Sequence, residues 1–277
     1  MTRLYADKGS TYYNSARREI LPLIPHSYAR VLELGCGEGA TLAWLKSINR
    51  CDESVGIELS EKAAVTARQV VDQVICADIE RDRIEFPNEY FDLILCLDVL
   101  EHLRDPWQTL SNLTRWLKPD GTVVVSIPNV RYKSVLVDLV LRGKFEYEDS
   151  GILDKTHLRF FTRASCHSLL EGAGLSVVSV LPNPRKVGGK WGLFNALSFG
   201  YFGDIFVWQY LMAAAKIAPP RRLCAGSEGY EDSPLNGEPL VPGEESRPVE
   251  ATIVRGPRTG SGGRTDDSNC RAITRID

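Results

Sequence analysis

Three glycines on alternate positions follow a short apolar run, and this pattern constrains the fold more than any other. The run 31–34 is typical of a strand buried in a parallel sheet. Gly35, Gly37 and Gly39 allow a sharp turn and let a ligand approach the backbone without meeting a Cβ atom. Residues 40–48 follow with helical spacing, so the first amides of that helix point towards whatever lies over the turn. The pattern predicts a nucleotide-binding crevice beyond the end of a first strand, with a plain strand–turn–helix corner as the alternative.

Apolar runs and segments of helical spacing alternate through the first half of the chain. The runs predict four further buried strands, at 54–57, 73–76, 91–97 and 122–127. Helices are predicted over 12–23, after the capping residue Ser60, and from Pro106 onwards, where Asp105 and Gln108 form a capping box. This alternation predicts an α/β fold, with a doubly wound, mostly parallel sheet between two layers of helices.

The second half is less regular and ends in a segment of different composition. Helices are predicted at 130–141 and from Thr162 to Gly174, a polar, aromatic-rich loop at 142–162, and strands at 176–181 and 206–216. From Pro219 onwards Pro, Gly, Glu, Ser and Arg dominate, and apolar residues are isolated. Such a segment cannot bury enough surface to offset its chain entropy. We therefore expect one folded domain over 1–218 and a disordered tail over 219–277.

Charge and cysteine content restrict the class of protein. The net charge of −3 gives no electrostatic footprint for nucleic acid, so we expect no nucleic-acid partner. The seven cysteines are odd in number and show no C-x-x-C pairing, which indicates buried thiols in a reducing compartment and no metal site. No apolar stretch has the length of a membrane-spanning helix, and the first residues lack the apolar core of a signal peptide. These features predict a soluble, cytoplasmic protein.

Carboxylates stand at the ends of the predicted strands. Glu33 lies in the first strand, and Glu58 ends the second, 19 residues after Gly39. A carboxylate at that separation from the glycine turn is placed to accept hydrogen bonds from ribose hydroxyls. Asp78, after the third strand, is placed to accept from an adenine amino group, and Asp98 follows the fourth strand. The strand ends therefore converge on one ligand crevice.

At this point the sequence resembles the class I S-adenosylmethionine-dependent methyltransferases, over roughly residues 12–216. The matching motifs, in the family's order, are VLELGCGEG at 31–39, VGIE at 55–58, CAD at 76–78, FDLI at 91–94 and LKPDG at 117–121. The resemblance implies a Rossmann-like sheet of seven strands and S-adenosylmethionine as cofactor. Dinucleotide-dependent oxidoreductases share the glycine turn but space it G-x-G-x-x-G, where this chain has Thr41 and Leu42 instead.

The resemblance also implies which residues bind the cofactor. They are Glu33, Gly35, Cys36, Gly37, Gly39, Glu58, Leu59, Asp78, Ile79, Leu97 and Asp98. Among them Glu58 is expected on the ribose diol and Asp78 near adenine. In similar proteins an arginine within a pattern like Tyr12–Arg17 helps to hold the methionine carboxylate, which makes Arg17 our candidate. The alternative is an arginine that faces solvent.

Methyl transfer from a sulfonium is an in-line displacement, so the protein supplies alignment and, for a hydroxyl acceptor, a base. His157 lies in the loop expected over the acceptor, within the lid region 130–162, and is our candidate base. Asp154 is placed either to orient His157 or to bind substrate, and His102 is placed to pack near the cofactor. Asn129 is either an acceptor-side residue or a turn residue.

The stretch 151–162 resembles one in bacterial methyltransferases that accompany glycosyltransferases and cell-surface polysaccharide genes, a set that includes quinone-biosynthesis O-methyltransferases. It favours O-methylation of a sugar or other small hydroxylated molecule, free or linked to a lipid or glycan. The aromatic-rich segment 190–210 is expected to pack on the sheet, with weak contact to a lipid surface as the alternative. A non-catalytic cofactor-binding scaffold and a dinucleotide-dependent oxidoreductase are the rival functions. The oligomeric state is left open.

Overall fold

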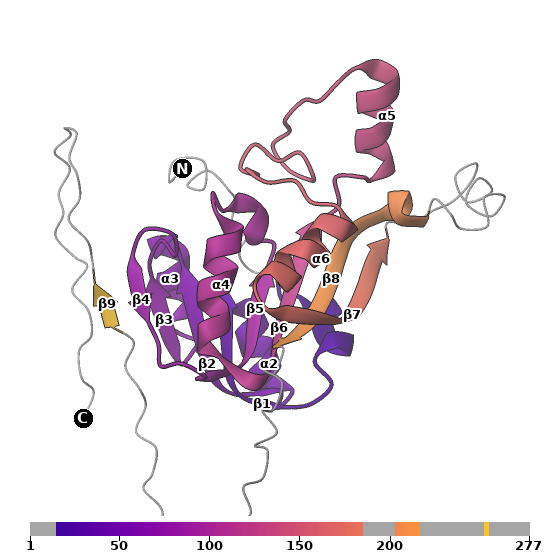
Figure 1. The fold of residues 1–277 in the computed structure, drawn as a ribbon. Helices are drawn as coiled ribbons and strands as arrows, with labels where there is room; N and C mark the ends of the chain where they lie inside the picture. The colour runs from indigo at the N-terminus through magenta and orange to yellow at the C-terminus, as the bar shows by residue number, and fades with distance from the viewer. Residues whose placement is uncertain (1–14, 185–202, 217–251, 255–277) are drawn as a thin grey trace, which may run out of the picture.

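The computed structural model describes residues 15–184, 203–216 and 252–254 (Figure 1). Within this part of the chain, seven strands form one sheet in the order β3-β2-β1-β5-β6-β8-β7. They are β1 (Tyr28–Leu34), β2 (Cys51–Glu58), β3 (Gln73–Cys76), β5 (Phe91–Leu97), β6 (Leu117–Pro128), β7 (Leu175–Pro184) and β8 (Val207–Lys216). Strand β8 runs antiparallel to both of its neighbours, and the pairs from β3 to β6 are parallel. The predicted mostly parallel sheet is confirmed.

Helices cover both faces of this sheet, so the fold has three layers (Figure 1). They are η2 (Arg18–Leu23), α2 (Ala40–Ser47), α3 (Glu61–Ala67), η3 (Leu100–His102), α4 (Pro106–Trp116), α5 (Lys133–Arg142), α6 (Arg163–Gly172) and η4 (Gly203–Phe206). The buried side chains of η2, α2 and α3 share one hydrophobic cluster, and those of α4 and α6 share another. Helix α5 belongs to neither, and Figure 1 shows it standing clear of the sheet.

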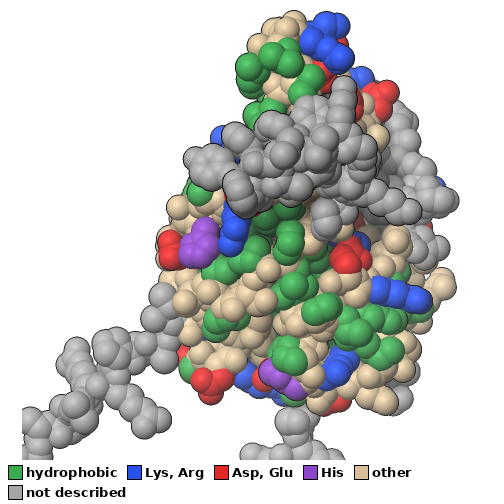
Figure 2. Space-filling model, turned by 90° about the vertical axis from the view of Figure 1, so that its right-hand side faces the viewer, with side chains coloured by type: hydrophobic (Ala, Val, Ile, Leu, Met, Phe, Trp, Pro, Cys, Tyr) green, Lys and Arg blue, Asp and Glu red, His purple; other side chains and the backbone are tan. Residues whose placement is uncertain are grey.

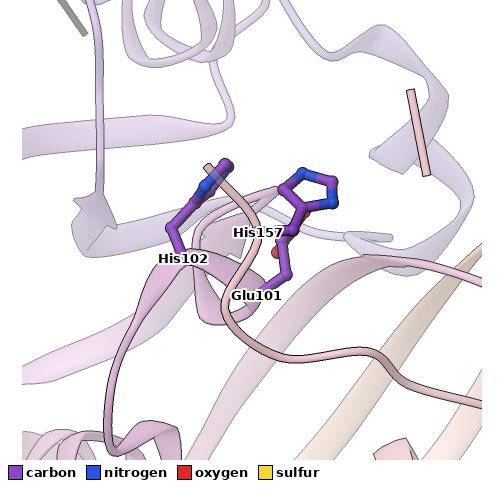
Figure 3. Close-up of side chains that lie close together, drawn as sticks. All are labelled: Glu101, His102 and His157. Carbon is purple, nitrogen blue, oxygen red and sulfur yellow. The ribbon is translucent and has the colours of Figure 1, made fainter. Parts of the chain in front are cut away.

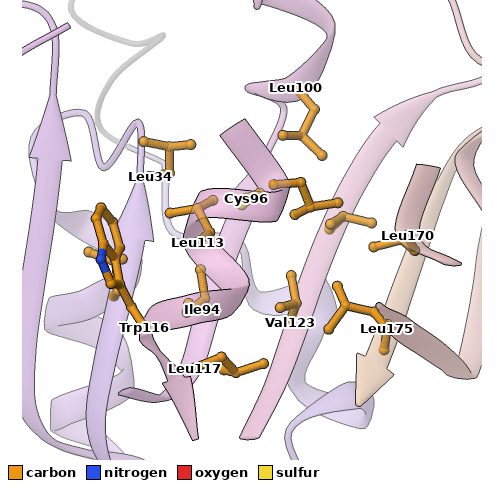
Figure 4. Packing of buried hydrophobic residues seen from close by; sticks show 14 of the residues in the cluster. Leu34, Ile94, Cys96, Leu100, Leu113, Trp116, Leu117, Val123, Leu170 and Leu175 are labelled. Carbon is orange, nitrogen blue, oxygen red and sulfur yellow. The ribbon is translucent and has the colours of Figure 1, made fainter. Parts of the chain in front are cut away.

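Alternate residues of the central strands supply the two hydrophobic clusters, because successive side chains of a strand point to opposite faces. In β1, Leu32 and Leu34 join the cluster of α4 and α6, while Val31 joins the cluster of η2 and α2. Figure 4 shows the first cluster, where Leu113 and Trp116 of α4 pack against the strands. Burial on both faces fixes the register of the strands, and therefore the positions of the residues at their ends.

Two of the predicted helix caps are present. The Ser60 side chain accepts a hydrogen bond from the Ala63 amide at 3.4 Å, and Asp105 Oδ1 accepts from the Gln108 amide at 2.9 Å. The Gln108 side chain instead donates to Asn112, so the predicted capping box is only half formed. The Ser60 cap starts α3 directly after β2, whereas α4 starts after η3.

Several sequence predictions need correction. In place of the helix predicted over 12–23, the described residues contain only the short 3-10 helix η2, which includes Pro22, a residue without an amide donor. The motif LKPDG at 117–121 lies inside β6, although Pro, Asp and Gly are typical turn residues. Strands β4 (Arg83–Glu85) and β9 (Thr252–Val254), which form an antiparallel pair, were not predicted, because three residues carry no periodic signal.

Strand β9 lies within the tail that the sequence predicts to be disordered, and it pairs with β4. The rest of the tail lies outside the described residues, as do 190–202 of the aromatic segment. The division between domain and tail therefore stays a prediction. Across the portion that the structure describes, no helix combines the length and the apolar character needed to cross a membrane.

Candidate functional site

The glycine turn after β1 has the left-handed backbone that its sequence predicts. Gly35, Gly37 and Gly39 have φ of +69°, +56° and +82°. A Cβ atom on Gly39 would lie 2.6 Å from a methyl carbon of Val71, and one on Gly35 would lie 3.2 Å from a methyl carbon of Val99. The turn is fixed to the neighbouring strand, because the Gly35 amide donates to the carbonyl of Ile57 at 2.8 Å. Gly35 is exposed, whereas Gly37 and Gly39 are buried, and a side chain at Gly35 or Gly39 would press against its neighbours.

Glu58 joins the glycine turn to the end of β2. Its carboxylate accepts hydrogen bonds from the amide of Gly37 at 2.9 Å and from the amide of Ser60 at 2.8 Å. Burial raises the pKa of Glu58 above its ordinary value, although these amides oppose the shift. Each oxygen keeps a further lone pair, so the carboxylate can also accept from a diol. The geometry fits the predicted ribose contact.

Glu33 is a buried carboxylate with an unused acceptor. Its side chain is only 3% exposed, and its Oε2 has no hydrogen-bond partner among the described residues. Burial raises the pKa of Glu33 to about 8, while a hydrogen bond with Thr41 and the charge of Arg17 act in the opposite direction. A buried carboxylate oxygen without a partner is costly unless a donor or cation reaches it. A ligand ammonium over the glycine turn would be such a partner.

Arg17 does not face solvent but crosses the ends of three strands. Its guanidinium forms an ion pair with Asp98 after β5, donates to the Ser126 hydroxyl of β6 at 3.0 Å, and lies 3.4 Å from Gln209 Oε1 of β8. Asp98 in turn accepts from the Ser126 hydroxyl at 2.8 Å and from the Gln209 amide. Arg17 and Asp98 therefore lie in the crevice, in a charged network at the centre of the sheet edge.

Sequence reasoning missed Ser126 and Gln209. Both lie near the ends of β6 and β8, at the same edge of the sheet as Asp98. Ser126 falls within a predicted strand, and its place opposite Leu97 in the next strand was a usable signal. Gln209 gave no such signal in the sequence. It reaches this edge because β8 is antiparallel and brings its amino-terminal end there.

The remaining predicted cofactor residues differ in how they can contribute. The thiol of Cys36 points against Gly56 of β2, because a Cβ atom on Gly56 would lie 2.5 Å from Cys36 Sγ. Only the backbone of Cys36 therefore faces the turn. Leu59 is 39% exposed, Leu97 is buried, and Ile79 packs against the larger hydrophobic cluster. Asp78 accepts from the Glu80 amide at 3.0 Å and pairs with Arg81 at 3.5 Å, which shapes the turn after β3.

The acceptor side consists of α5 and the loop that leads to α6. The loop is fixed to η3, because the amides of Leu158 and Arg159 both donate to the carbonyl of Glu101, at 2.8 and 3.0 Å. A small hydrophobic cluster supports it: Tyr132, Val135, Ile152 and Leu153, with Val130, Phe160 and Trp208 packed against them. The loop residues therefore lie beside η3, the short helix that follows β5.

Asp154 and His157 are both buried, and each has a hydrogen-bond partner within the loop. Asp154 Oδ1 accepts from the Thr156 amide at 2.8 Å and from the Thr156 hydroxyl at 2.7 Å. The Nδ1 atom of His157 lies 2.9 Å from the carbonyl oxygen of Ile152. The carbonyl, rather than Asp154, thus orients the His157 ring at Nδ1, and Asp154 shapes the loop. Short Asp side chains commonly accept hydrogen bonds from the backbone two residues on, as Asp154 does here.

His157 meets His102 and Glu101 in a buried cluster (Figure 3). The two imidazole rings lie edge to face with centroids 4.7 Å apart, and His102 Nδ1 lies 3.1 Å from the carbonyl oxygen of Thr156. Glu101 is 1% exposed, and neither of its carboxylate oxygens has a hydrogen-bond partner among the described residues. Burial and the charge of Asp98 raise the pKa of Glu101 well above its ordinary value. The sequence analysis did not select Glu101, although it directly precedes His102.

Asn129 is a structural residue in this arrangement. Its amide nitrogen donates to the carbonyls of Asp204 and Val207, each at 2.9 Å, and its oxygen accepts from the Arg131 amide at 3.0 Å. Of the two alternatives, the structure therefore favours the turn residue. Asn129 also forms a bridge with Phe161, which ties the end of β6 to the end of the acceptor loop.

The sheet order, the glycine turn and the acidic strand ends together define a class I S-adenosylmethionine-dependent methyltransferase. Residues 5–180 match a family model described as a methyltransferase domain, and the chain belongs to this family. S-adenosylmethionine is therefore its cofactor. The site fits that molecule, because Glu33 has an unpartnered oxygen, Glu58 has lone pairs for a diol and the glycine turn is bare. When bound, the cofactor supplies the methyl group to be transferred.

Curated relatives include ubiquinone biosynthesis O-methyltransferases. The protein of that name from Neisseria meningitidis serogroup A is 31% identical over 156 residues, which is 53% of this chain and 64% of the relative. The one from Thiobacillus denitrificans is 33% identical over 122 residues, covering 42% of this chain and 51% of the relative. In both cases the match spans less than two thirds of the relative's length.

Solved structures show the same fold at low identity. A methyltransferase solved with the Haloferax volcanii Trm112 methyltransferase activator has a TM-score of 0.54 and 20% identity, covering 80% of this chain and 96% of that chain. An S-adenosylmethionine-dependent methyltransferase from Archaeoglobus fulgidus has a TM-score of 0.52 and 17% identity. The match covers 75% of this chain and 95% of that chain. The [4+2]-cyclase SpnF has a TM-score of 0.51 and 14% identity. The match covers 77% of this chain and 86% of that chain. These likenesses concern the fold alone.

Proposed function

We propose that this methyltransferase transfers the methyl group to a hydroxyl oxygen of a small molecule, a sugar or another hydroxylated ring compound. The observation that carries the proposal is the buried Glu101–His102–His157 cluster beside the crevice (Figure 3). Attack by a hydroxyl requires that its proton be taken up, and a cluster of two imidazoles and a carboxylate is suited to that task near neutral pH.

His157 is the residue that we assign to this proton transfer. Its Nδ1 lies against the carbonyl of Ile152, and a carbonyl can only accept a hydrogen bond. The proton of the neutral ring is therefore on Nδ1, which leaves Nε2 as the proton-accepting atom. The ring is 7% exposed, so little water competes for that atom. The arrangement supports a base whose orientation is fixed before the acceptor binds.

The acceptor class has support from two sources. The stretch 151–162 resembles polysaccharide-associated methyltransferases, and the curated relatives carry the name O-methyltransferase. A phenolic hydroxyl ionises near pH 10, far more readily than a sugar hydroxyl, so a phenol places less demand on the base. Phenols and sugars both belong to the proposed class of hydroxylated acceptors, so the assays include both.

The experiment is a transfer assay with isotopically labelled S-adenosylmethionine and three sets of acceptors: sugars and nucleotide sugars, catechols and other phenols, and amines. We expect label on a hydroxylated compound and none on the amines. His157→Gln should lower kcat at least about 100-fold while the affinity for S-adenosylhomocysteine stays within about twofold. His167→Gln, on exposed α6, is the matched control and should leave kcat unchanged.

Two results would overturn the proposal. Label found only on amines would make the protein an N-methyltransferase. Cofactor binding without transfer to any acceptor, together with no effect of His157→Gln in cells, would instead support the scaffold function.

A further inference from the structure

Three buried groups that bind metals in other proteins lie together at the end of β5. Glu101, His102 and His157 each offer one ligand atom, and these atoms all lie within 4.8 Å of one another. The three side chains are 1%, 8% and 7% exposed. Glu101 and His102 come from η3 and His157 comes from the acceptor loop, as Figure 3 shows. The cluster therefore joins two separate segments of the chain.

Both imidazoles are oriented as metal-binding histidines usually are. His102 Nδ1 lies 3.1 Å from the carbonyl of Thr156, and His157 Nδ1 lies 2.9 Å from the carbonyl of Ile152. A carbonyl fixes the proton on Nδ1 and makes Nε2 the atom with the lone pair. Such outer contacts orient the ring and raise the basicity of the ligating nitrogen.

The Glu101 carboxylate needs a positive partner, and a proton alone does not satisfy it. A protonated carboxyl is still a hydrogen-bond donor and acceptor, and in the described part of the chain neither oxygen has a hydrogen-bond partner. A cation held between Glu101 and the two imidazoles would satisfy these oxygens and compensate the buried charge. Bonds of about 2.0–2.2 Å to such a cation would bring the ligand atoms closer together than the 4.8 Å within which they lie here.

We propose that Glu101, His102 and His157 bind one divalent transition-metal cation. Two imidazoles and one carboxylate favour zinc, iron(II) or manganese(II) over magnesium or calcium, which prefer all-oxygen sites. Three protein ligands leave at least one position open. This site departs from the expectation, drawn from cysteine spacing, that the chain has no metal site; that reasoning could not detect ligands that a loop brings together.

The metal site goes beyond the proposed function, and its consequence for that function is specific. With a metal in place both histidines would be ligands, so the cation would lower the pKa of a bound hydroxyl and the released proton would pass to solvent rather than to His157. The cation also links the acceptor loop to η3, in addition to the two backbone bonds from Leu158 and Arg159 to Glu101. Metal binding can be measured without any acceptor.

The test uses the full chain, treated with a chelator and then titrated with Zn²⁺ by calorimetry and with Co²⁺ by visible absorption. We expect one equivalent of Zn²⁺ to bind, and Co²⁺ to develop the absorption bands of a site with nitrogen and oxygen ligands. Glu101→Gln and His102→Gln should each weaken Zn²⁺ binding at least about tenfold. S-adenosylhomocysteine affinity, unchanged in each variant, serves as the measure of correct folding.

The matched control is the double variant His167→Ala/Glu171→Ala, which removes an exposed histidine–carboxylate pair at 3.3 Å on α6. Its Zn²⁺ affinity should equal that of the parent. No binding by the parent, or equal binding by the parent and Glu101→Gln, would overturn the proposed site.

Transfer assays with and without metal separate this inference from the proposed function. One bound equivalent with no hydroxyl methylation would leave the metal site standing and reject the proposed function. Methylation that continues at full rate in metal-free protein would reject a catalytic role for the metal and leave His157 as the base, while the binding titration alone decides whether the metal site exists.

Discussion

The cofactor side and the acceptor side of this molecule lie at the same sheet edge but are built differently. The cofactor side consists of strand ends and one glycine turn, held by backbone bonds between β1 and β2 and packed against two large hydrophobic clusters. The acceptor side consists of α5 and one loop, supported by four buried hydrophobic residues. It is linked to η3 by a pair of amides bonded to the Glu101 carbonyl and by the contact of His102 with the Thr156 carbonyl, and to the end of β6 by the bridge between Asn129 and Phe161.

Because of this difference, the sheet determines how the cofactor binds and the loop determines how the acceptor binds. A ligand that binds along backbone at strand ends depends on the sheet register, which burial on both faces fixes. A ligand that binds under a loop depends on a few local contacts, which change without cost to the core. Substitutions on the two sides should therefore have separable effects on cofactor affinity and on acceptor turnover.

The largest effect is expected for Gly37→Val. Valine at φ +56° is strained, and its side chain occupies the space that the cofactor must approach. We expect the affinity for S-adenosylhomocysteine, measured by calorimetry, to fall at least about 300-fold. The control is Gly143→Val, at φ +65° with open space around its Cβ position, which introduces similar strain away from the crevice. Equal affinities in these two variants would contradict our placement of the cofactor.

Glu58→Ala should have the next largest effect. It removes the acceptor for the amides of Gly37 and Ser60 together with the ribose contact. We expect about 100-fold weaker binding of S-adenosylhomocysteine and a loss of about 2 kcal/mol in the free energy of unfolding. The control is Glu53→Ala, near the other end of β2, where Glu53 pairs with Arg30. It should change neither the affinity for S-adenosylhomocysteine nor the free energy of unfolding by much. A variant with unchanged cofactor affinity would place the ribose elsewhere.

The buried Glu33 should give the cofactor-free protein a pH-dependent stability. Because its pKa in the folded state is raised to about 8, the folded state binds a proton that the unfolded state has lost between about pH 5 and 8. Its contribution to stability is therefore greatest at low pH and falls as the pH rises through this window. Relative to Glu33→Gln, we expect the parent to lose about 2 kcal/mol of unfolding free energy between pH 6 and 8.

Denaturant unfolding of both proteins at several pH values measures this difference. Glu85→Gln, on the exposed strand β4, is the control and should follow the parent at every pH. Parallel pH profiles for the parent and Glu33→Gln would show that Arg17 and Thr41 keep Glu33 ionised in the folded protein.

The sequence predicted the cofactor side well, because local patterns specify it. Phe91–Leu97 and Gln73–Cys76 are apolar runs of the length of a strand, and both strands have these bounds in the structure. The glycine turn and the Ser60 cap are likewise short-range signals. The partners of Arg17 at Ser126 and Gln209 are more than 100 residues away in sequence, and no local pattern connects them.

The acceptor side was predicted only in part, since its contacts depend on how one loop folds. The sequence analysis placed His157 in a loop over the acceptor, but it could not predict the orientation of the ring. Asp154 is used by Thr156, and the Ile152 carbonyl orients His157, which is a backbone contact that no sequence pattern encodes. Glu101 was missed because a glutamate next to a histidine is unremarkable until the loop buries both.

Asp154→Ala should test how far the loop acts apart from the cofactor side. The substitution leaves the amide and the hydroxyl of Thr156 without this acceptor in a buried turn, at a cost of about 1–2 kcal/mol. We expect faster amide hydrogen exchange across 152–158 and a lower kcat, while the affinity for S-adenosylhomocysteine changes less than about twofold. Asp154→Asn keeps one acceptor oxygen and should have a smaller effect. A parallel loss of cofactor affinity would mean that the two sides are coupled.

The smallest effect is expected on α5, whose outer surface lies outside both large hydrophobic clusters. Val140 and Leu141 are 72% and 77% exposed, and Figure 2 shows hydrophobic side chains beside Lys and Arg on the lobe at the top of the view. Because neither residue is buried, Val140→Ser with Leu141→Ser should change the free energy of unfolding by less than about 0.5 kcal/mol and leave cofactor affinity unchanged. Val135→Ser, inside the small cluster with Ile152, is the buried comparison and should cost at least about 1 kcal/mol. If the exposed pair cost as much as Val135, the outer face of α5 would be covered in solution, and the acceptor side would be larger than the loop and helix described above.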